Sequence, residues 1–442
     1  MKMRMIACLF VVTLLTGSLP ASAQQPSAGR PYQGLFAGGV NDAEQLLSAS
    51  GTLGGGYSNN VFADPLVVGV GQTPTLVAGP SASEYGSATA GLSYTFARSR
   101  LSVGASASSD TRYFPNLDDR LITGYSGHAG VTVRVLSNLS VTQNVSYQPW
   151  YAFSPFPQVT EARLGHAPIG GAALAASRDG YLHSSSALGF TQALGRRSSL
   201  ALSYAYVVSN FDGPSDDLRT QSGSGVYRYA FMRDLGVRVG YSYSEGRYGA
   251  ADDDTRRINS HIIDAGLDFN RALSLTRRTT LSFATGTAAM NDQIRTHYRF
   301  TGHATLNHQI GRTWDATFGY ERNLSFVEAF HQPLFYDAVS AGVSGLITRR
   351  LEFRASAGAS FGELGLAQSN NYDSVYAGSS LTQALSRYLA LGVDYNVQWY
   401  RFGSGQELPP GLSQDMSWHS VRGYVSVWAP LVQSGRRSNA TR

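Results

Sequence analysis

The feature that most constrains the fold is a two-residue alternation that continues for ten or more residues. In the segment 389–399, leucine, valine, tyrosine and tryptophan occupy every second position, and small or polar residues lie between them. Period two indicates a β-strand with one apolar and one polar face. Soluble strands usually have about five or six residues, whereas a tilted membrane-spanning strand needs about 9–11. The pattern favours membrane strands; a soluble secreted β-protein is the alternative.

The same alternation recurs along the chain, for example in 200–209, 235–244 and 351–358, and the segments are joined in pairs by short turns. Most of these turns lie about 40 residues apart, a spacing that a propeller repeat shares, but the length of the segments favours a membrane barrel. The expected strand centres are Gly55, Leu92, Val103, Val131, Val145, Ala187, Leu202, Tyr227, Val239, Ala265, Phe283, Ala304, Phe318, Ala341, Ala355, Gly378, Val393 and Val425.

These centres predict an all-β fold, a transmembrane antiparallel up-and-down β-barrel of about 18 strands, with 16 as the alternative count. An even number returns both ends of the chain to one side, as bacterial barrels require. Closure also satisfies every backbone N–H and C=O in a solvent that can satisfy none. About 18 strands enclose a lumen wide enough for an aqueous channel.

The first residues predict export. Lys2 and Arg4 precede an apolar run from about Met5 to Leu15, and Ala21-Ser22-Ala23 follows as a cleavage site. The alternative is an N-terminal membrane anchor, for which the apolar run is short. We therefore expect a signal peptide at 1–23, a flexible periplasmic segment at 24–47, the barrel at 48–432 and a periplasmic tail at 433–442, in the cell outer membrane of a Gram-negative bacterium.

Composition narrows the chemistry. The only cysteine, Cys8, lies inside the expected leader, so the mature chain is expected to have no disulfide and no thiolate metal site. The formal net charge is +5, but no block of Lys and Arg suggests a nucleic-acid partner. We expect no cofactor and no metal.

The polar faces of the expected strands carry charged and amide residues that would line a pore. Their mixed signs predict either a hydrated interior or cross-strand ion pairs that fill it, and the alternation alone leaves both open. The candidate pore-lining residues are Arg238, Asp264, Asp268, Asp315, Glu321, Glu352, Arg354, Asp394, Asn396 and Gln398.

The connections fall into two classes. Short turns carry arginines, as at 196–197 and 349–350, and should face the periplasm; the longer connections should face outside. One of the longest, 154–178, contains several proline and glycine residues. It could fold into the lumen and narrow it, or it could be a surface loop.

An enzyme is not expected. The segment 358–362 spells Gly-x-Ser-x-Gly, but that motif needs a strand-to-helix turn and here it continues a strand. His183 and His419 each precede a serine, and neighbours on a strand point to opposite faces. His297 and His303 share a face but are about 20 Å apart, too far for one metal ion.

The segment 56–62, Gly-Tyr-Ser-Asn-Asn-Val-Phe, resembles the opening strand of a group of outer-membrane barrels, some of which are encoded with exopolysaccharide or exosortase systems. The stretches 319–326 and 337–339 are similar to a late hairpin in such proteins. The resemblance implies a conduit or accessory role in polysaccharide export. One departure is that the chain continues beyond the last strand, where Trp428 would serve as the terminal aromatic residue of the barrel-assembly signal.

We therefore expect a pore or conduit for hydrophilic solute or polymer. A non-conducting structural or surface-interaction barrel is the alternative, and an outer-membrane lipid hydrolase comes third. The expected partners are outer-membrane lipid and lipopolysaccharide, the barrel-assembly machinery and components of polysaccharide export.

Overall fold

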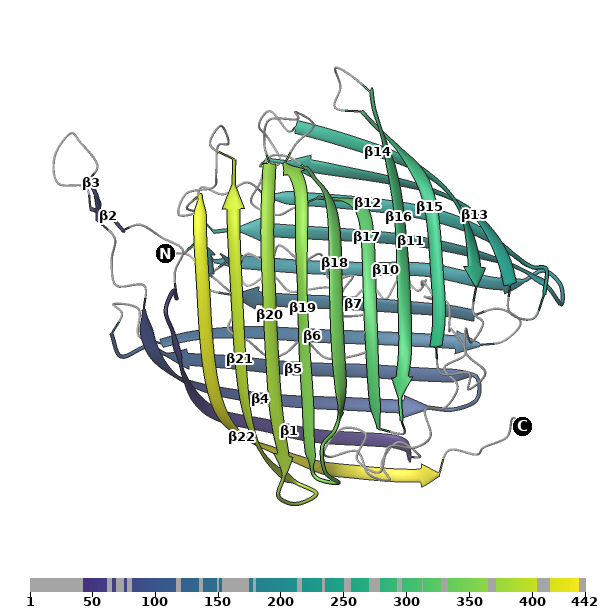
Figure 1. Cartoon of the computed structure of the whole chain (residues 1–442). Coiled ribbons are helices and arrows are strands. Elements are labelled where there is room, and N and C mark those ends of the chain that lie inside the picture. Colours follow the sequence, from purple (N-terminus) through teal and green to yellow (C-terminus); the bar gives the residue numbers. More distant parts are fainter. Residues whose placement is uncertain are drawn as a thin grey trace, which may run out of the picture.

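A computed structural model of the chain describes most of its strands (Figure 1). The described residues are 43–61, 66–68, 75–77, 82–116, 121–134, 138–148, 151–152, 175–177, 180–212, 217–232, 235–249, 256–269, 279–291, 296–311, 313–326, 333–364, 371–403 and 414–436. The strands of the main sheet are β1 (Ala43–Ser58), β4 (Ser83–Ala97), β5 (Leu101–Tyr113), β6 (Leu121–Arg134), β7 (Asn138–Gln148), β10 (Tyr181–Ala193), β11 (Ser198–Phe211), β12 (Leu218–Ala230), β13 (Leu235–Tyr248), β14 (Arg256–Phe269), β15 (Thr279–Asn291), β16 (Thr296–Ile310), β17 (Trp314–Phe326), β18 (Pro333–Leu346), β19 (Leu351–Leu364), β20 (Asn371–Ala384), β21 (Leu389–Phe402) and β22 (Asp415–Arg436).

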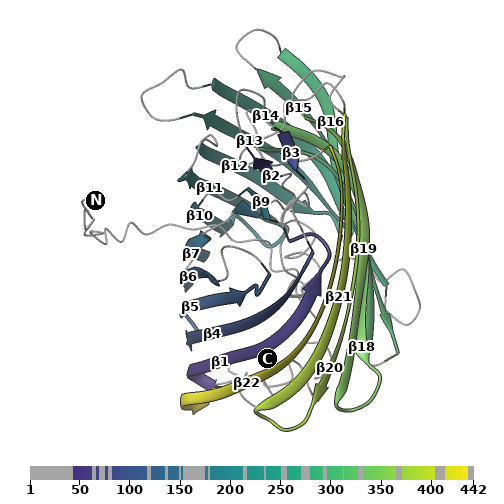
Figure 2. The same ribbon diagram turned by 90° about the vertical axis from the view of Figure 1, so that its left-hand side faces the viewer.

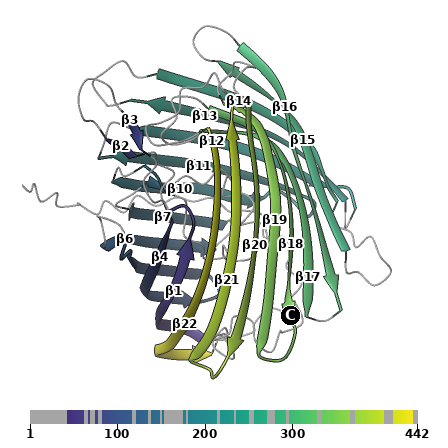
Figure 3. The same cartoon turned by 60° about the vertical axis from the view of Figure 1, so that its left-hand side comes forward.

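These strands form one closed antiparallel sheet of 18 strands. Each strand pairs with its neighbours in sequence, and β22 pairs with β1 to close the barrel, which Figure 3 shows as the yellow and purple strands side by side. The predicted fold class and the preferred strand count are confirmed, and every expected centre lies within one of these strands.

The barrel has two walls whose strands cross. In Figure 1 the green and yellow strands β18–β21 run vertically in front, while the blue and teal strands β4–β7 and β10–β13 run across behind them. Figure 2 shows the two walls facing each other, with β1 and β22 joining them along the lower edge. Crossing of opposite walls is the expected consequence of strands that tilt relative to the barrel axis.

The barrel extends beyond the bounds predicted from the alternation. β1 begins at Ala43, before the expected start at 48, and β22 continues to Arg436, after the expected end at 432. The two extensions pair with each other, from Ala43 opposite Arg436, with a register shift between Leu47 and Ser48. Backbone pairing rather than side-chain alternation therefore sets these ends. The expected leader and residues 24–42 lie outside the described residues.

Both ends of the described chain lie at one end of the barrel, together with seven turns of three or four residues and the nine-residue connection 270–278; the other connections, from the four-residue 292–295 upward, lie at the opposite end. Two of the longer connections contain small hairpins, β2 (Leu66–Val68) with β3 (Thr75–Val77) and β8 (Tyr151–Ala152) with β9 (Ala175–Ser177). The rest of the connection 154–178 lies outside the described residues. Within the part of the chain that the structure describes, no helix is long and apolar enough to cross a membrane.

Candidate lumen-lining site

Exposure of the side chains shows which face of each strand points outward. On β21, Val393 is 54% exposed and Tyr395 is also exposed, whereas Asp394 between them is 3% exposed. The apolar positions of the other strands, such as Leu202 and Phe318, are exposed in the same way. The outer surface is therefore apolar, and the polar positions of the same strands point into the barrel.

Asp394 and Arg422 form the most enclosed ion pair of the inner face. The two residues are direct partners across β21 and β22, and the Asp394 Oδ2 to Arg422 Nη2 distance is 2.6 Å. The guanidinium group of Arg422 also lies 4.9 Å from the ring centroid of Tyr424. The Tyr424 ring in turn covers Gly392, where an added Cβ would overlap it. A glycine is required at 392 because the tyrosine occupies that side of the neighbouring strand.

The paired positions continue this charge pattern around the barrel. Asp394 pairs with Ser380, Ser380 with Arg354, Arg354 with Ser344, and Ser344 with Asp315. Acidic and basic residues therefore alternate along one row with serines between them. Arg354 also donates to Glu352 Oε1 of its own strand at 3.0 Å.

A second charge group lies on β13, β14 and β16. Arg238 Nε is 3.3 Å from Asp264 Oδ2, and Arg238 Nη2 is 3.3 Å from His303 Nε2. The Asp264 carboxylate lies over Gly240, so a side chain at that position would displace it. His303 pairs with Glu321, which is buried and accepts a hydrogen bond from Asn323 Nδ2 at 3.1 Å.

The strands β5–β7 and β10–β12 form a different inner surface, which we call the serine-lined wall. Its inward polar side chains bond to one another in exposed cross-strand pairs. These pairs are Ser108 with Ser126 at 2.5 Å, His128 with Asn144 at 2.5 Å and Ser203 with Ser224 at 2.6 Å. Small polar residues that stay exposed inside a barrel indicate a hydrated lumen beside this wall.

Most of the predicted pore-lining residues take part in these groups. Asn396 is buried, and Gln398 Oε1 accepts a hydrogen bond from the Tyr400 hydroxyl at 2.7 Å. The side chain of Asp268 lies outside the described ones. That the whole set lines a conducting pore stays a prediction.

The alternation did not identify an aromatic layer inside the outer mouth. Tyr248, Tyr336, Tyr372 and Tyr400 lie near the ends of their strands, and each is almost completely buried. Tyr372 packs on Phe402 with ring centroids 5.3 Å apart, and Tyr248 packs with Leu218 and Ile258. The sequence feature that could have predicted this layer is a tyrosine at an inward position within four residues of the end of each of these strands.

The residues considered for catalysis have partners elsewhere in the barrel. His183 Nδ1 is 3.2 Å from Ser209 Oγ and 3.1 Å from the Tyr181 hydroxyl. Ser360 of the Gly-x-Ser-x-Gly segment is buried within β19, which continues through the motif. His419 Nδ1 and the Tyr395 hydroxyl form a hydrogen bond of 3.0 Å. Ser420 Oγ lies 3.4 Å from the Tyr85 hydroxyl. Among the described residues, no three His, Cys, Asp or Glu side chains are grouped to hold a metal ion.

A closed barrel with an apolar outer face and a polar, charged inner face defines the class of this chain. Only helices and closed barrels satisfy their backbone polar groups in a bilayer, and this distribution of side chains is that of outer-membrane barrels. The chain is an outer-membrane β-barrel protein.

The chain was compared with known protein families, curated proteins and solved structures. No family model matches the chain, and no curated protein matches it in sequence. OpdQ of Pseudomonas aeruginosa aligns over 88% of this chain and 98% of its own, with 10% identity and a TM-score of 0.44. OccK5 (OpdH) of the same organism gives 88% and 99% coverage, 11% identity and a TM-score of 0.43. The siderophore receptor PirA of Acinetobacter baumannii gives 88% and 81% coverage, 8% identity and a TM-score of 0.43. The assignment above rests on this chain's own geometry.

Proposed function

We propose that the chain is a pore for hydrophilic solutes. The observation that carries the proposal is the serine-lined wall, where inward polar side chains such as Ser203 and Ser126 remain exposed within the closed barrel. A structural barrel filled by its own side chains would use larger residues there and bury them. Arg354 and Asp394 on the opposite wall, and Arg238 on β13 beside the serine-lined wall, add charged groups with their partners, which supports hydration along the path.

Planar-bilayer recording of the purified barrel tests this proposal. We expect steady single-channel current, and a water-soluble thiol reagent should reduce it when Ser203 is replaced by cysteine. The matched control is Leu202→Cys, one residue away on the lipid-facing side, which should leave the current unchanged. The expected mature chain has no other cysteine, so there is no background reaction. A folded barrel that passes no current would instead support the structural-barrel alternative.

The narrower part of the proposal concerns the cargo, which we propose to be an exopolysaccharide. Its support is the resemblance of 56–62 and 319–326 to barrels of such systems, together with two inward tyrosine rings, Tyr376 over Gly358 and Tyr424 over Gly392. Sugar rings have apolar faces that pack on aromatic rings. Oligosaccharides added to the bilayer chamber should interrupt the current of the wild type, and less so in Tyr376→Leu. Equal interruption in both proteins would remove this support.

A further inference from the structure

Three arginines lie side by side across three strands. Arg219 of β12 is the direct partner of Arg247 of β13, and Arg247 is the direct partner of Arg257 of β14. Each is the second residue from the end of its strand, at the end of the barrel with the longer connections. Like charges directly opposite one another in a sheet destabilise it. The positive charge of three adjacent arginines therefore needs anionic groups nearby to neutralise it.

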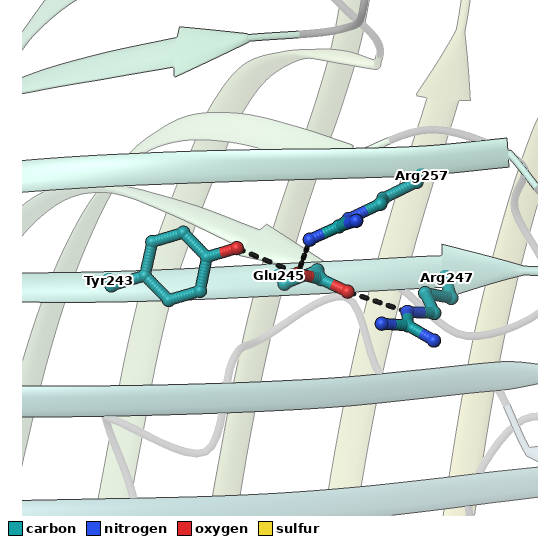
Figure 4. Close-up of polar contacts among 4 residues, drawn as sticks. All are labelled: Tyr243, Glu245, Arg247 and Arg257. Carbon is teal, nitrogen blue, oxygen red and sulfur yellow. Dashed lines mark hydrogen bonds and ion pairs between the residues drawn. The ribbon is translucent and has the colours of Figure 1, made fainter.

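The row lies on the outer face of the barrel. On β13 the positions that share its face include Val239 and Tyr241, and on β14 they include Ile263, all of which are exposed apolar or aromatic side chains. Arg247 is 52% exposed and Arg257 is 49% exposed. Figure 4 shows Arg247 and Arg257 of this row lying against β13 and β14, with the yellow strands of the opposite wall beyond them.

Glu245 neutralises part of this charge. Its Oε1 is 2.6 Å from Arg247 Nε, its Oε2 is 2.5 Å from Arg257 Nη2, and the Tyr243 hydroxyl donates to Oε2 at 2.7 Å (Figure 4). The Glu245 side chain is 1% exposed, so these bonds replace its water. Glu245 is one carboxylate against three guanidinium groups. The Asp217 carboxylate, two residues before Arg219, accepts the backbone N–H of Phe211 at 3.0 Å and lowers the excess to one positive charge.

The height of the row matches that of lipid headgroups. Arg247 is between five and six residues from the middle of β13 (Leu235–Tyr248). With a rise of about 3.4 Å per residue and a tilt of about 40°, it lies about 14 Å from the midplane. The apolar band of an outer-membrane barrel is about 25 Å tall, so hydrocarbon ends about 12 Å from the midplane. The guanidinium groups therefore lie just outside the hydrocarbon, and Glu245 lies just within it.

We propose that Arg219, Arg247 and Arg257 bind the phosphate groups of a phosphorylated glycolipid of the outer leaflet, of the lipid A type. Guanidinium groups bind phosphate through two parallel hydrogen bonds. Glu245 holds Arg247 and Arg257 in place and leaves Arg219 to complete the site. Nearer the middle of the same two strands, Tyr241, Tyr243 and His261 share the outer face; the Tyr243 and His261 rings lie 5.1 Å apart, and the Tyr241 hydroxyl is 2.8 Å from His261 Nδ1. The site is independent of whether the lumen conducts.

Native mass spectrometry of the purified full chain in detergent tests the site with diphosphorylated lipid A as the probe. The variant is Arg219→Gln with Arg247→Gln and Arg257→Gln. A charge-matched control is Arg196→Gln with Arg197→Gln and Arg349→Gln, in exposed turns at the other end of the barrel. Wild type and control should bind the lipid equally, and the variant should bind it at least about tenfold more weakly, since charge-assisted bonds to phosphate are lost.

Two further arms fix the chemistry. Dephosphorylated lipid A should bind the wild type as weakly as the intact lipid binds the variant, and inorganic phosphate at equal concentration should not displace the intact lipid. Equal lipid binding by variant and wild type, or equal binding of the dephosphorylated lipid, would overturn the proposal. Displacement by inorganic phosphate would overturn the lipid as the ligand. If the triple variant fails to fold, Arg219→Gln alone, which leaves the Glu245 bonds in place, should still weaken binding.

Discussion

Adjacent residues on the two faces of β11 allow a test of which face contacts lipid. Leu202 and Ser203 are neighbours, and Leu202 is exposed on the outer face while Ser203 bonds to Ser224 on the inner face. We expect Leu202→Arg to destabilise the barrel much more than Ser203→Arg. The same charge is added in both cases, one residue apart, so the side of the wall is the difference that is measured.

The size of the effect follows from depth. Leu202 is between two and three residues from the middle of β11 (Ser198–Phe211), which places it about 6–7 Å from the midplane. An arginine costs about 2–4 kcal/mol at the midplane and about 0–1 kcal/mol near the interface. We therefore expect a loss of about 2 kcal/mol for Leu202→Arg. Ser203→Arg loses one exposed hydroxyl bond, so its cost should stay below about 1 kcal/mol.

The assay is guanidinium unfolding in lipid bilayers, followed by tryptophan fluorescence, with the free energy of unfolding taken by linear extrapolation. Leu202→Ala separates the loss of the leucine from the addition of charge. Equal losses for the two arginine variants would refute the assignment of the faces. A loss in Leu202→Arg no larger than that in Leu202→Ala would show that this position is not in hydrocarbon.

Three more outcomes test the inner face and the arginine row. Asp394→Asn should lower the free energy of unfolding by about 2–4 kcal/mol, because it leaves Arg422, only 17% exposed, without its carboxylate; in the same assay Asp394→Leu with Arg422→Met should recover most of the loss, and additive losses would contradict a coupled pair. Gly392→Ala should reduce stability by about 1–3 kcal/mol through overlap with Tyr424, and Tyr424→Leu should relieve the loss; an unchanged midpoint in Gly392→Ala would contradict the contact. Glu245→Gln should destabilise the barrel more at about 0.05 M salt than at about 0.5 M when unfolding is measured in urea, which adds no ions, since unneutralised arginines repel one another and salt screens them; a loss independent of salt would argue against repulsion.

The strands themselves could be predicted because the two faces of the wall meet different solvents. Alternation such as Leu391, Val393 and Tyr395 with Asp394 between them is imposed by lipid on one side and polar surroundings on the other. A strand must also be long enough to cross, which made each centre visible. The ends were less visible, since outside the hydrocarbon the pairing of Ala43 with Arg436 needs no apolar residue.

The partners across strands could not be predicted in the same way. Arg422 was missed as the partner of Asp394 because their register depends on the length of the connection 403–414, and period two carries no information about it. Asn396 was expected at a polar surface lining the pore, and it is only 9% exposed. Alternation gives the direction of a side chain, and packing decides whether water reaches it.

Glu245 shows where the alternation assigns a residue to the wrong solvent. Its position on β13 directs it outward, where an ionised carboxylate in hydrocarbon would be very unfavourable. Hydrogen bonds from Tyr243, Arg247 and Arg257 stabilise the buried Glu245 carboxylate. Both arginines lie at the level of the lipid headgroups. A charged residue at an outward, apolar position of a strand therefore indicates a local group of hydrogen-bonding partners, which the alternation alone does not predict.

The arrangement of charge inside the barrel bears on how a pore of this kind would discriminate between solutes. Asp394 and Arg422 are direct partners, and Arg238 contacts Asp264, so each positive charge of these groups lies close to a negative one. The field of such a pair falls off within a few ångströms, whereas unpaired charges on one wall would act across the lumen. The proposed pore would therefore prefer cations or anions only weakly, and its selection would depend on size and on hydrogen bonding along the serine-lined wall. Such a pore would suit a neutral, hydroxyl-rich solute better than a small ion.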